Sequence, residues 1–567
     1  MFLTRGQFMA KRKRRKYELI ISKTREWPVV LLTKHRDEFM EDVVEESFEK
    51  IIQMCPGKAA LREELETTMY RERLRIKTMP WKADPPDDTD FWNYVKASLV
   101  SSATNKDDHA ERKLLKEIIT RYVNEIFSTF KPSRHRLARR IVIGGFRRLL
   151  NATKIKTLTG AITGKHTLRD KIEITGEIEQ LRSLATKGII VMVPTHFSNI
   201  DSVLIAWVIF ELGLPPFIYG AGLNLFNIGL FAYFMNSLGA YKVDRRKKNL
   251  PYMEALKSYS ALAIQRGCHS LFFPGGTRSR SGKIEKSLKL GLLGTAVEAQ
   301  RKSFQEAEEN GNDAIKIYVV PVTLNYNFVL EAPLLIRQYL ERKGQERYYF
   351  EVDEYSTSYK IFTFLVKFFT KETKISVSIG RALNLVGNYV DKEGNSLDQY
   401  GNIIDIREYF MSDGKITENL QREQEYTRML SNVIVKEFHR INKVMPSHLV
   451  AFVGFRIWRK QYPKLDLYNF FRLPVDELYI PYNDFKSAFE IIKEQIFRLH
   501  EEGKVDITDL LQQPTDVIIE TGLNNVGMYH VARPIIMNNQ GNIITQDLHT
   551  LYFYHNRMDG YDLEQFI

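Results

Sequence analysis

Between about residues 172 and 390 the chain alternates short apolar runs with helical patterns, and this alternation constrains the fold more than any other feature. The apolar runs are too short for buried helices and rich in β-branched residues, so they predict strands. We expect strands at residues 189–193, 217–219, 240–243, 271–273, 317–322 and 375–379. Strands that alternate with helices are typical of an α/β sheet covered by helices. Pro321 has no backbone N–H, so we expect its strand at a sheet edge or a bulge.

The segments on both sides of this region are predicted to be mainly helical. Apolar residues recur three and four positions apart among charged helix formers, which is typical of amphipathic helices. We expect such helices at residues 38–53, 59–77, 110–130, 134–150 and 422–442. The chain therefore divides into an N-terminal helical region (1–170), an α/β domain (171–390) and a helical and mixed extension (391–567), with a hairpin near residues 538–542.

Charge and cysteine content limit the classes of partner and site. The formal net charge of the 567 residues is +13, which favours an anionic partner such as nucleic acid, an anionic membrane or an acidic protein. The two cysteines, Cys55 and Cys268, predict neither a disulfide framework nor a zinc site and fit a reducing cytoplasm. Since no apolar run reaches about 18 residues, we expect a soluble or peripheral protein.

His196 and Asp201 are the first candidates for catalysis. His196 follows the predicted strand at 189–193, and Asp201 comes five positions later, where a helical apolar pattern begins. In one continuous helix these side chains would lie on different faces, but at a strand–turn–helix corner the carboxylate can fold back onto the imidazole. That contact fixes the tautomer and leaves the other ring nitrogen free to accept a proton. The alternative is a chance match, because the chain has 12 histidines and about one His-x4-Asp spacing is expected by chance. His196 would then only cap a helix start or bind a backbone carbonyl.

Two basic loops follow other predicted strands. Asp244-Arg245-Arg246 follows the strand at 240–243, and a glycine- and hydroxyl-rich loop with Arg278 and Arg280 follows the strand at 271–273. Arginine binds phosphate oxygens with paired hydrogen bonds, and glycine lets a backbone approach a ligand closely. Functional loops gather at the carboxyl ends of strands in open α/β sheets, so we expect a site for a phosphorylated alcohol beside His196. The alternative is a solvated basic rim and an ordinary turn.

Four motifs in this order resemble the four blocks of glycerolipid acyltransferases. They are His-x4-Asp at 196–201, Gly-Ala-x-x-Val-x-Arg at 239–245, Phe-Pro-x-Gly-Thr-Arg-Ser-Arg-x-Gly-Lys at 273–283 and Val-Val-Pro-Val at 319–322. The flanks, including residues 444–451 and 553–557, are similar to the larger glycerol-3-phosphate and dihydroxyacetone-phosphate acyltransferase branch. One position departs from the pattern: the third block most often reads Phe-Pro-Glu-Gly, and here Gly275 replaces the glutamate.

The resemblance implies a mixed sheet covered by helices and an O-acyltransferase of phospholipid biosynthesis. The enzyme would move a fatty acyl group from acyl-CoA or an acidic acyl carrier protein to the hydroxyl of glycerol 3-phosphate, with 1-acylglycerol 3-phosphate (lysophosphatidate) as the alternative acceptor. It implies His196 as general base and Asp201 as its orienting partner, and no metal or further cofactor. We expect the acceptor to be bound by Lys242, Arg245, Gly276, Thr277, Arg278, Ser279, Arg280 and Pro321, with Arg246 and Lys283 as outer cations.

Further expectations concern the acyl chain and the membrane. We expect residues 203–230, with Pro321, to line an acyl groove; the alternative for most of these side chains is ordinary core. We expect the helix start after Asn199 to donate to the developing oxyanion. The basic and aromatic segments at 11–16, 134–150 and 359–369 are candidates for lipid contact; the alternative for 134–150 is a helix packed on the core with a solvated basic face. These features predict a cytoplasmic protein bound peripherally to the inner face of the cell membrane. The alternative of another class is a non-catalytic basic protein that binds membrane or nucleic acid, although no nucleic-acid motif is visible and we expect no nucleic-acid partner.

Overall fold

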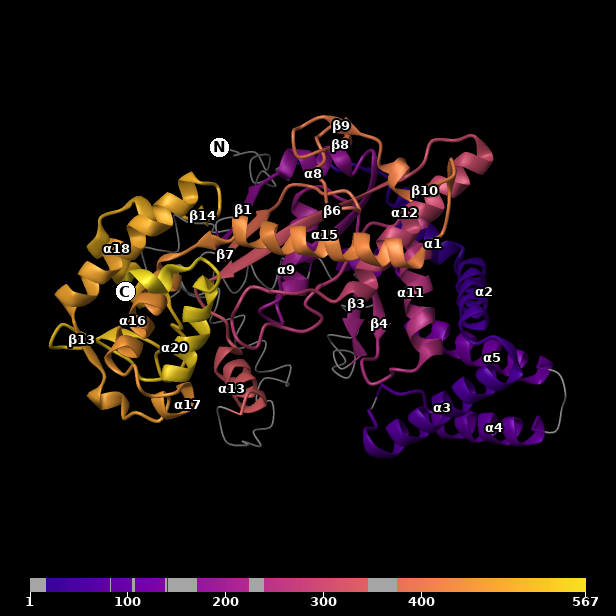
Figure 1. The fold of residues 1–567 in the computed structure, drawn as a ribbon, viewed down its shortest axis with the longest axis horizontal. Helices are drawn as coiled ribbons and strands as arrows, with labels where there is room; N and C mark the ends of the chain where they lie inside the picture. Colours follow the sequence, from indigo (N-terminus) through magenta and orange to yellow (C-terminus); the bar gives the residue numbers. More distant parts are fainter. Residues whose placement is uncertain are drawn as a thin grey trace, which may run out of the picture.

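A seven-stranded sheet forms the centre of the molecule (Figure 1). The structure, a computed structural model, describes residues 17–81, 83–103, 108–137, 140, 171–223, 239–344 and 375–567. The strands are β1 (Ile172–Gly176), β2 (Gly188–Pro194), β3 (Ile218–Gly222), β4 (Ala240–Val243), β5 (Ser270–Leu271), β6 (Lys316–Tyr326) and β7 (Ile375–Ile379). Their order in the sheet is β1-β7-β6-β2-β5-β3-β4. The predicted strands are therefore confirmed, with β1 added at one edge.

The sheet is mixed, as the resemblance implied. β6, β2, β5, β3 and β4 run parallel to one another, so their carboxyl ends share one edge. β7 is antiparallel to β6, and β1 pairs parallel with β7. The parallel part of the sheet therefore carries the loops that follow β2, β4 and β5 to the same side of the molecule.

The expected edge position of Pro321 is wrong. β6 lies between β7 and β2, and Pro321 pairs with Val193 inside the sheet. Its carbonyl accepts a hydrogen bond from Gly380, just beyond the end of β7, and the pairing resumes only at Val319 with Leu383. The missing proline N–H is tolerated because the ladder with β7 is interrupted at this point.

Successive residues of β2 point to opposite faces of the sheet, and each face is covered by helices. Ile190 and Met192 pack in the cluster that contains residues of α8 (Ile178–Leu184) and α9 (Asp201–Glu211). Ile189 and Val191 pack on the other face, which is covered by α11 (Leu250–Gln265), α12 (Leu290–Asn310) and α15 (Leu420–Arg440). This near-continuous apolar strand is what a central strand covered on both faces requires.

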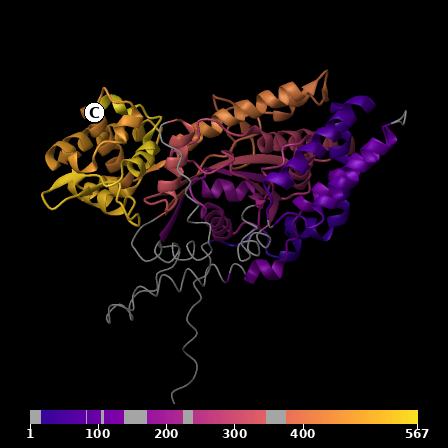
Figure 2. The ribbon, with the colours of Figure 1, turned by 90° about the horizontal axis from the view of Figure 1, so that it is seen from below.

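The N-terminal helices lie at the β4 end of the sheet, and the C-terminal helices lie at the other end (Figures 1 and 2). The N-terminal group is α1 (Pro28–Lys34), α2 (Arg36–Met54), α3 (Gly57–Thr78), α4 (Asp88–Ser101) and α5 (His109–Ile126), and it shares a core with α11 and Tyr241. The predicted helices at 38–53, 59–77, 110–130 and 422–442 are confirmed as α2, α3, α5 and α15.

The C-terminal extension packs its apolar side chains into the same cluster as the sheet. Its main helices are α16 (Pro446–Gln461), α17 (Leu467–Phe470), α18 (Tyr482–Glu501), α19 (Thr515–Asn525) and α20 (Leu548–His555). The predicted hairpin is confirmed as β15 (Ile536–Met537) and β16 (Asn542–Ile544), and β13 (Tyr479–Pro481) adds a third strand. Short pairs complete the region: β8 (Ser396–Leu397) with β9 (Ile403–Ile404), β10 (Met411–Ser412) with β11 (Lys415–Ile416), and β12 (Lys443–Val444) with β14 (Asp506–Ile507).

The candidate lipid-contact segments at 11–16 and 359–369, and all of 134–150 beyond residues 134–137 and 140, lie outside the described residues. In the part of the chain that the structure describes, no helix is both long enough and apolar enough to cross a membrane.

Candidate active site

His196 and Asp201 meet at the corner between β2 and α9, as the sequence predicts. His196 Nδ1 lies 2.8 Å from Asp201 Oδ2. Asp201 is fully buried, whereas the His196 side chain keeps 15% of its surface exposed. β2 ends at Pro194 and α9 begins at Asp201, so the carboxylate lies at a helix N-terminus, where negative charge is favoured.

Asp201 is held by more than the imidazole. The backbone N–H groups of Phe197 and Ser198 donate to its Oδ2 over 2.7 and 2.9 Å. Its other oxygen, Oδ1, accepts from the hydroxyl of Tyr326, the last residue of β6. Burial, followed by the neighbouring Asp201 charge, raises the pKa of Tyr326 well above its usual value, which keeps this hydroxyl a donor. Four donors thus fix the carboxylate that orients His196.

The imidazole itself is placed for proton transfer. The ring of Phe273, after β5, stacks on His196 with centroids 4.1 Å apart. Nδ1 is bound to Asp201, whereas Nε2 has no hydrogen bond from any residue that the structure describes. The geometry leaves one ring nitrogen available to a bound hydroxyl group.

Glu331 joins the histidine loop to the third motif. Its carboxylate accepts from Ser198 Oγ at 3.0 Å and from the Asn199 N–H at 2.9 Å. It also receives Arg278 Nη1 at 3.2 Å. In addition, the Ser279 N–H donates to the His196 carbonyl over 2.7 Å. The two loops that were expected to converge are therefore in direct contact.

Arg245, Arg278 and Arg280 gather at this edge. The pKa of Arg245 is lowered by burial and then by Arg278, and that of Arg280 is lowered by burial and then by Arg342, Arg278 and Arg245. A guanidinium group whose charge lowers the pKa of another lies near it, and an anion between such groups would relieve the repulsion. Arg342, at the end of α13 (Ala332–Arg342), joins them and was not expected from the sequence.

Other predicted cations lie elsewhere. Arg246 binds Asp84 and Asp244 and covers the Trp81 ring, so it fastens β4 to the N-terminal helices. Lys283 pairs with Asp559 of the C-terminal extension at 3.3 Å. Burial lowers the pKa of Lys242, and the charge that opposes this shift is Glu125 of α5, not a partner in the arginine group. Arg246 and Lys283 are thus structural cations.

The remaining loop residues shape the third motif. Gly276 has a φ of +74°, a conformation that favours glycine. Arg280 Nη1 donates to Thr277 Oγ1 over 3.4 Å, and Ser279 Oγ donates to the Lys283 carbonyl over 2.8 Å. Pro321 lies within β6 and pairs with Val193, one residue before the end of β2.

The backbone N–H groups just before the start of α9 bind carboxylates. The N–H groups of Phe197 and Ser198 donate to Asp201, and that of Asn199 donates to Glu331. These donors hold the corner between β2 and α9 in shape. That the helix start after Asn199 donates to the oxyanion stays a prediction.

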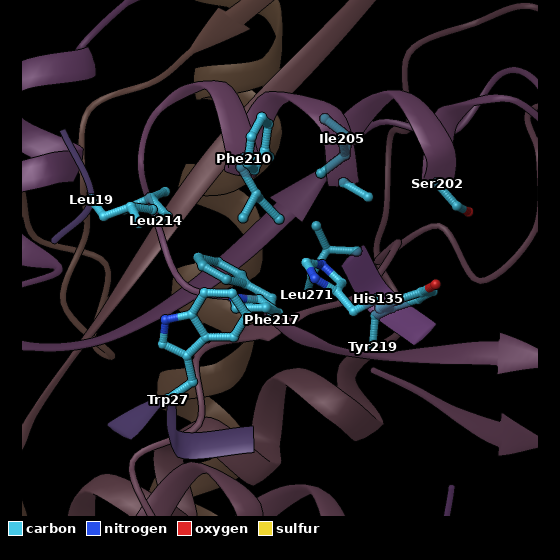
Figure 3. Close-up of a pocket in the computed structure, with 13 residues that line it drawn as sticks. Leu19, Trp27, His135, Ser202, Ile205, Phe210, Leu214, Phe217, Tyr219 and Leu271 are labelled. Carbon is cyan, nitrogen blue, oxygen red and sulfur yellow. The ribbon is translucent and has the colours of Figure 1, made fainter. Parts of the chain in front are cut away.

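A predominantly apolar pocket lies beneath α9, between Ser202 in its first turn and Phe210 (Figure 3). The pocket is open to solvent and narrow, with a cavity volume of about 40 Å³. Ser202, Ile205, Ala206, Ile209 and Phe210 of α9 line it, with Leu214, Pro216, Phe217, Tyr219 and Leu271. Leu19, Trp27 and His135 of the N-terminal region complete the wall. The lining residues between Ile205 and Tyr219 belong to the stretch 203–230 that the sequence suggested for an acyl groove. Pro321 does not line this pocket, and residues 224–230 lie outside the described chain.

The C-terminal extension contacts the opposite side of the histidine loop. Arg557, after α20, is buried with its guanidinium 4.0 Å from the centre of the Phe197 ring and donates to the Leu324 carbonyl at 2.9 Å. Burial lowers its pKa to about 10. His448 of α16 and Tyr326 line the same small pocket. Both flanking motifs noted in the sequence, at 444–451 and 553–557, therefore approach the catalytic corner.

Comparison with known proteins agrees with this arrangement. Residues 172–325 match the family model described as Acyltransferase. A glycerol-3-phosphate acyltransferase of Pseudomonas aeruginosa (strain UCBPP-PA14) is 27% identical over 267 residues, which are 46% of this chain and 28% of the relative. Another of Histophilus somni (strain 129Pt) is 34% identical over 155 residues, 27% of this chain and 18% of the relative.

These matches cover less than a third of the length of each relative. Within the matched part lie the His196–Asp201 pair, the loops that carry Arg245, Arg278 and Arg280, and the central strands of the sheet. Over residues 172–325 the chain is therefore similar to the acyltransferase family, and the two relatives are named glycerol-3-phosphate acyltransferases.

Proposed function

We propose that this chain is an O-acyltransferase that moves a fatty acyl group from an acyl thioester to a hydroxyl of glycerol 3-phosphate. The observation that carries the proposal is the contact between two loops at one sheet edge. One loop presents His196 with Nδ1 bound to Asp201, and the other presents Arg278 next to Ser279, whose N–H binds the His196 carbonyl. A base and a phosphate-binding group therefore stand side by side. The names of the relatives support glycerol 3-phosphate as the acceptor.

The proposed reaction needs no acyl-enzyme intermediate. The acceptor hydroxyl gives its proton to His196 Nε2 as its oxygen attacks the thioester carbonyl carbon. The buried Asp201 carboxylate stabilises the imidazolium that forms. The tetrahedral intermediate then expels the thiolate, which takes the proton from Nε2. A new ester and a free thiol result, and His196 returns to its starting state.

The arginines select a phosphorylated acceptor. The charge of Arg278 lowers the pKa of Arg245, and the charges of Arg278 and Arg245 lower the pKa of Arg280, so these like charges repel one another. A phosphate dianion would relieve this repulsion and accept paired hydrogen bonds from the guanidinium groups. Arg278 is already oriented by Glu331, which limits the freedom it would lose on binding.

The pocket beneath α9 is the proposed site for the acyl chain. It begins at Ser202, directly after Asp201, and its wall is mainly aliphatic and aromatic (Figure 3). Binding of a fatty acyl chain there would be favoured by roughly 0.8 kcal/mol for each methylene that the pocket buries. Trp27 and His135 come from the N-terminal region, so this region contributes to the proposed acyl site.

The proposed donor is acyl-CoA or an acyl carrier protein, and the proposed role is in phospholipid biosynthesis at a membrane surface. The formal net charge of +13 supports attraction to acidic carrier proteins and anionic lipid headgroups. The acyl-glycerol product is amphipathic, which favours its release at a bilayer.

An acceptor panel tests the proposal. Purified protein is mixed with labelled acyl-CoA or acyl carrier protein and with glycerol 3-phosphate, dihydroxyacetone phosphate or lysophosphatidate, in the presence of anionic vesicles. We expect labelled ester with glycerol 3-phosphate at the highest kcat/KM. A preference for lysophosphatidate would contradict the acceptor assignment, and no ester with any acceptor would contradict the enzymatic proposal.

A further inference from the structure

Gly275, the position where the third motif departs from its family, lies against the carboxylate of Glu285. A methyl group placed on Gly275 would lie 2.9 Å from Glu285 Oε1 and 3.1 Å from Glu285 Cγ. Gly275 is not among the glycines with positive φ, so its backbone accepts other residues. The space filled by Glu285, and not the backbone conformation, is therefore what excludes a side chain at position 275.

Glu285 reaches the catalytic histidine from this position. Its Oε1 accepts a long hydrogen bond, 3.4 Å, from the backbone N–H of His196. Its Oε2 is buried and has no hydrogen-bond partner in the described part of the chain. Burial raises the pKa of Glu285 to about 7, so near neutral pH the group is often a neutral carboxylic acid. A neutral carboxyl group can remain in this buried place without a cation bound to it.

The segment that carries Glu285 is fixed at both ends to the third motif. The Lys289 N–H donates to the Pro274 carbonyl over 2.7 Å, and Ser279 Oγ donates to the Lys283 carbonyl over 2.8 Å. On its outer side, Asn556 Nδ2 of the C-terminal extension donates to the Ser281 carbonyl over 2.8 Å. These bonds hold Glu285 between Gly275 and His196.

We propose that Glu285 supplies from position 285 the carboxyl group that this chain lacks at position 275, and that it is a positioning residue for His196. The assignment rests on the proposed acyltransferase function. Oε1 supports the main chain of His196, while the side chain fills the space beside Gly275, two residues after the Phe273 ring that stacks on the imidazole. The carboxyl group usual at position 275 is then supplied from position 285, and the glycine at 275 leaves the space that the Glu285 side chain occupies.

Reciprocal substitutions test this pairing. Glu285→Ala is expected to lower kcat about 10- to 100-fold with little change in KM, because His196 loses its support. Gly275→Glu is expected to lower kcat as well, because two carboxyl groups compete for one space. The double variant Gly275→Glu/Glu285→Ala is expected to recover kcat to within about fivefold of the wild type, which independent sites would not do.

Two further variants separate positioning from general stability. Glu285→Gln keeps the shape and the acceptor oxygen, so it is expected to keep kcat within about threefold of the wild type. Glu309→Ala, the same kind of change at an exposed site on α12, serves as the matched control and should change nothing. A double variant no better than the worse single variant, or a fully active Glu285→Ala, would overturn the assignment.

Thermal unfolding distinguishes failure of this inference from failure of the proposed function. If the wild type forms no ester, the proposed function fails, but the Gly275–Glu285 pairing still has a readout. Gly275→Glu should lower the unfolding midpoint, and adding Glu285→Ala should raise it again. A midpoint that falls further in the double variant would show that the two positions do not share one space.

Discussion

The replacement Asp201→Asn distinguishes the two roles of the buried carboxylate, orientation and charge. Oδ2 of Asp201 receives three donors, from His196 Nδ1, Phe197 N and Ser198 N, at 2.7 to 2.9 Å. An amide NH₂ group placed there would face two fixed backbone donors, and each unsatisfied donor costs about 1–3 kcal/mol. The amide oxygen therefore takes that place, and the NH₂ group faces Tyr326, whose hydroxyl can turn to accept.

In this orientation the substituted amide still accepts from His196 Nδ1, so the tautomer is kept and only the negative charge is lost. Opposite charges about 4 Å apart at an effective dielectric constant of about 20 attract by about 4 kcal/mol, which is the upper limit of the loss. Since the amide dipole retains part of this attraction, we expect about 2–4 kcal/mol, or about 30- to 1,000-fold in kcat. The expected loss in kcat is smaller than the loss of about 10⁴-fold that follows an Asp→Asn change in a serine protease triad, where the amide imposes the wrong histidine tautomer.

The assay compares Asp201→Asn, Asp201→Ala and His196→Ala by thiol release from an acyl thioester at saturating glycerol 3-phosphate, with unfolding midpoints as controls. Asp201→Ala removes all four hydrogen bonds and is expected to approach the activity of His196→Ala. An Asp201→Asn variant that folds normally yet is as inactive as Asp201→Ala would refute the donor arrangement. Full activity in Asp201→Asn would refute the role of the charge.

Three further predictions concern the acceptor, the acyl chain and pH. Arg278→Ala should raise KM for glycerol 3-phosphate about 10- to 100-fold, from the loss of hydrogen bonds to a charged group. Arg246→Ala should leave that KM unchanged. It should instead lower the free energy of unfolding by about 3–5 kcal/mol, because it leaves Asp244 buried without its cation. An equal rise of KM in the Arg278→Ala and Arg246→Ala variants would contradict the assignment of Arg278 to the acceptor and of Arg246 to stability. Ala206→Trp should fill the pocket beneath α9 and shift the preferred donor to shorter acyl chains. The measurement is the ratio of kcat/KM between short-chain and long-chain donors. An unchanged ratio would place the acyl chain elsewhere. Finally, folding raises the pKa of Glu285 from 4.5 to about 7. Between pH 4.5 and about 7 the folded state therefore binds more protons than the unfolded state. The free energy of unfolding should fall by at most about 3 kcal/mol as the pH rises through this range. Denaturant unfolding of Glu285→Gln should lack this component, and a pH dependence identical to that of the wild type would contradict it.

The catalytic corner could be predicted because it is local in sequence. His196 and Asp201 are separated by a single turn between β2 and α9, and an apolar run followed by a helical pattern is enough to define such a corner. Arg278 and Arg245 were predicted for a related reason. Both follow parallel strands, and parallel strands bring their carboxyl ends to one edge whatever their order in the sheet.

The partners from distant segments could not be predicted in this way. Tyr326 reaches Asp201 because β6 is the neighbour of β2, and Glu331 follows β6 in a loop with no motif of its own. A tyrosine at the end of a long apolar strand was the only signal for Tyr326. Arg246 was predicted as an outer cation of the site, but Asp84, far earlier in the chain, binds it instead. The proximity of Glu285 to Gly275 can be recognised only from the structure, because nothing in the sequence places the two residues together.

The central claim is that His196 is the base for acyl transfer to a phosphorylated acceptor. The most direct test measures two quantities on wild type and His196→Ala: ester formation from labelled acyl thioester and glycerol 3-phosphate, and binding of glycerol 3-phosphate by calorimetry. We predict that His196→Ala forms no ester above background and binds glycerol 3-phosphate as the wild type does, because the arginines that hold the phosphate are intact. Ester formation by His196→Ala at a rate close to that of the wild type would contradict the account.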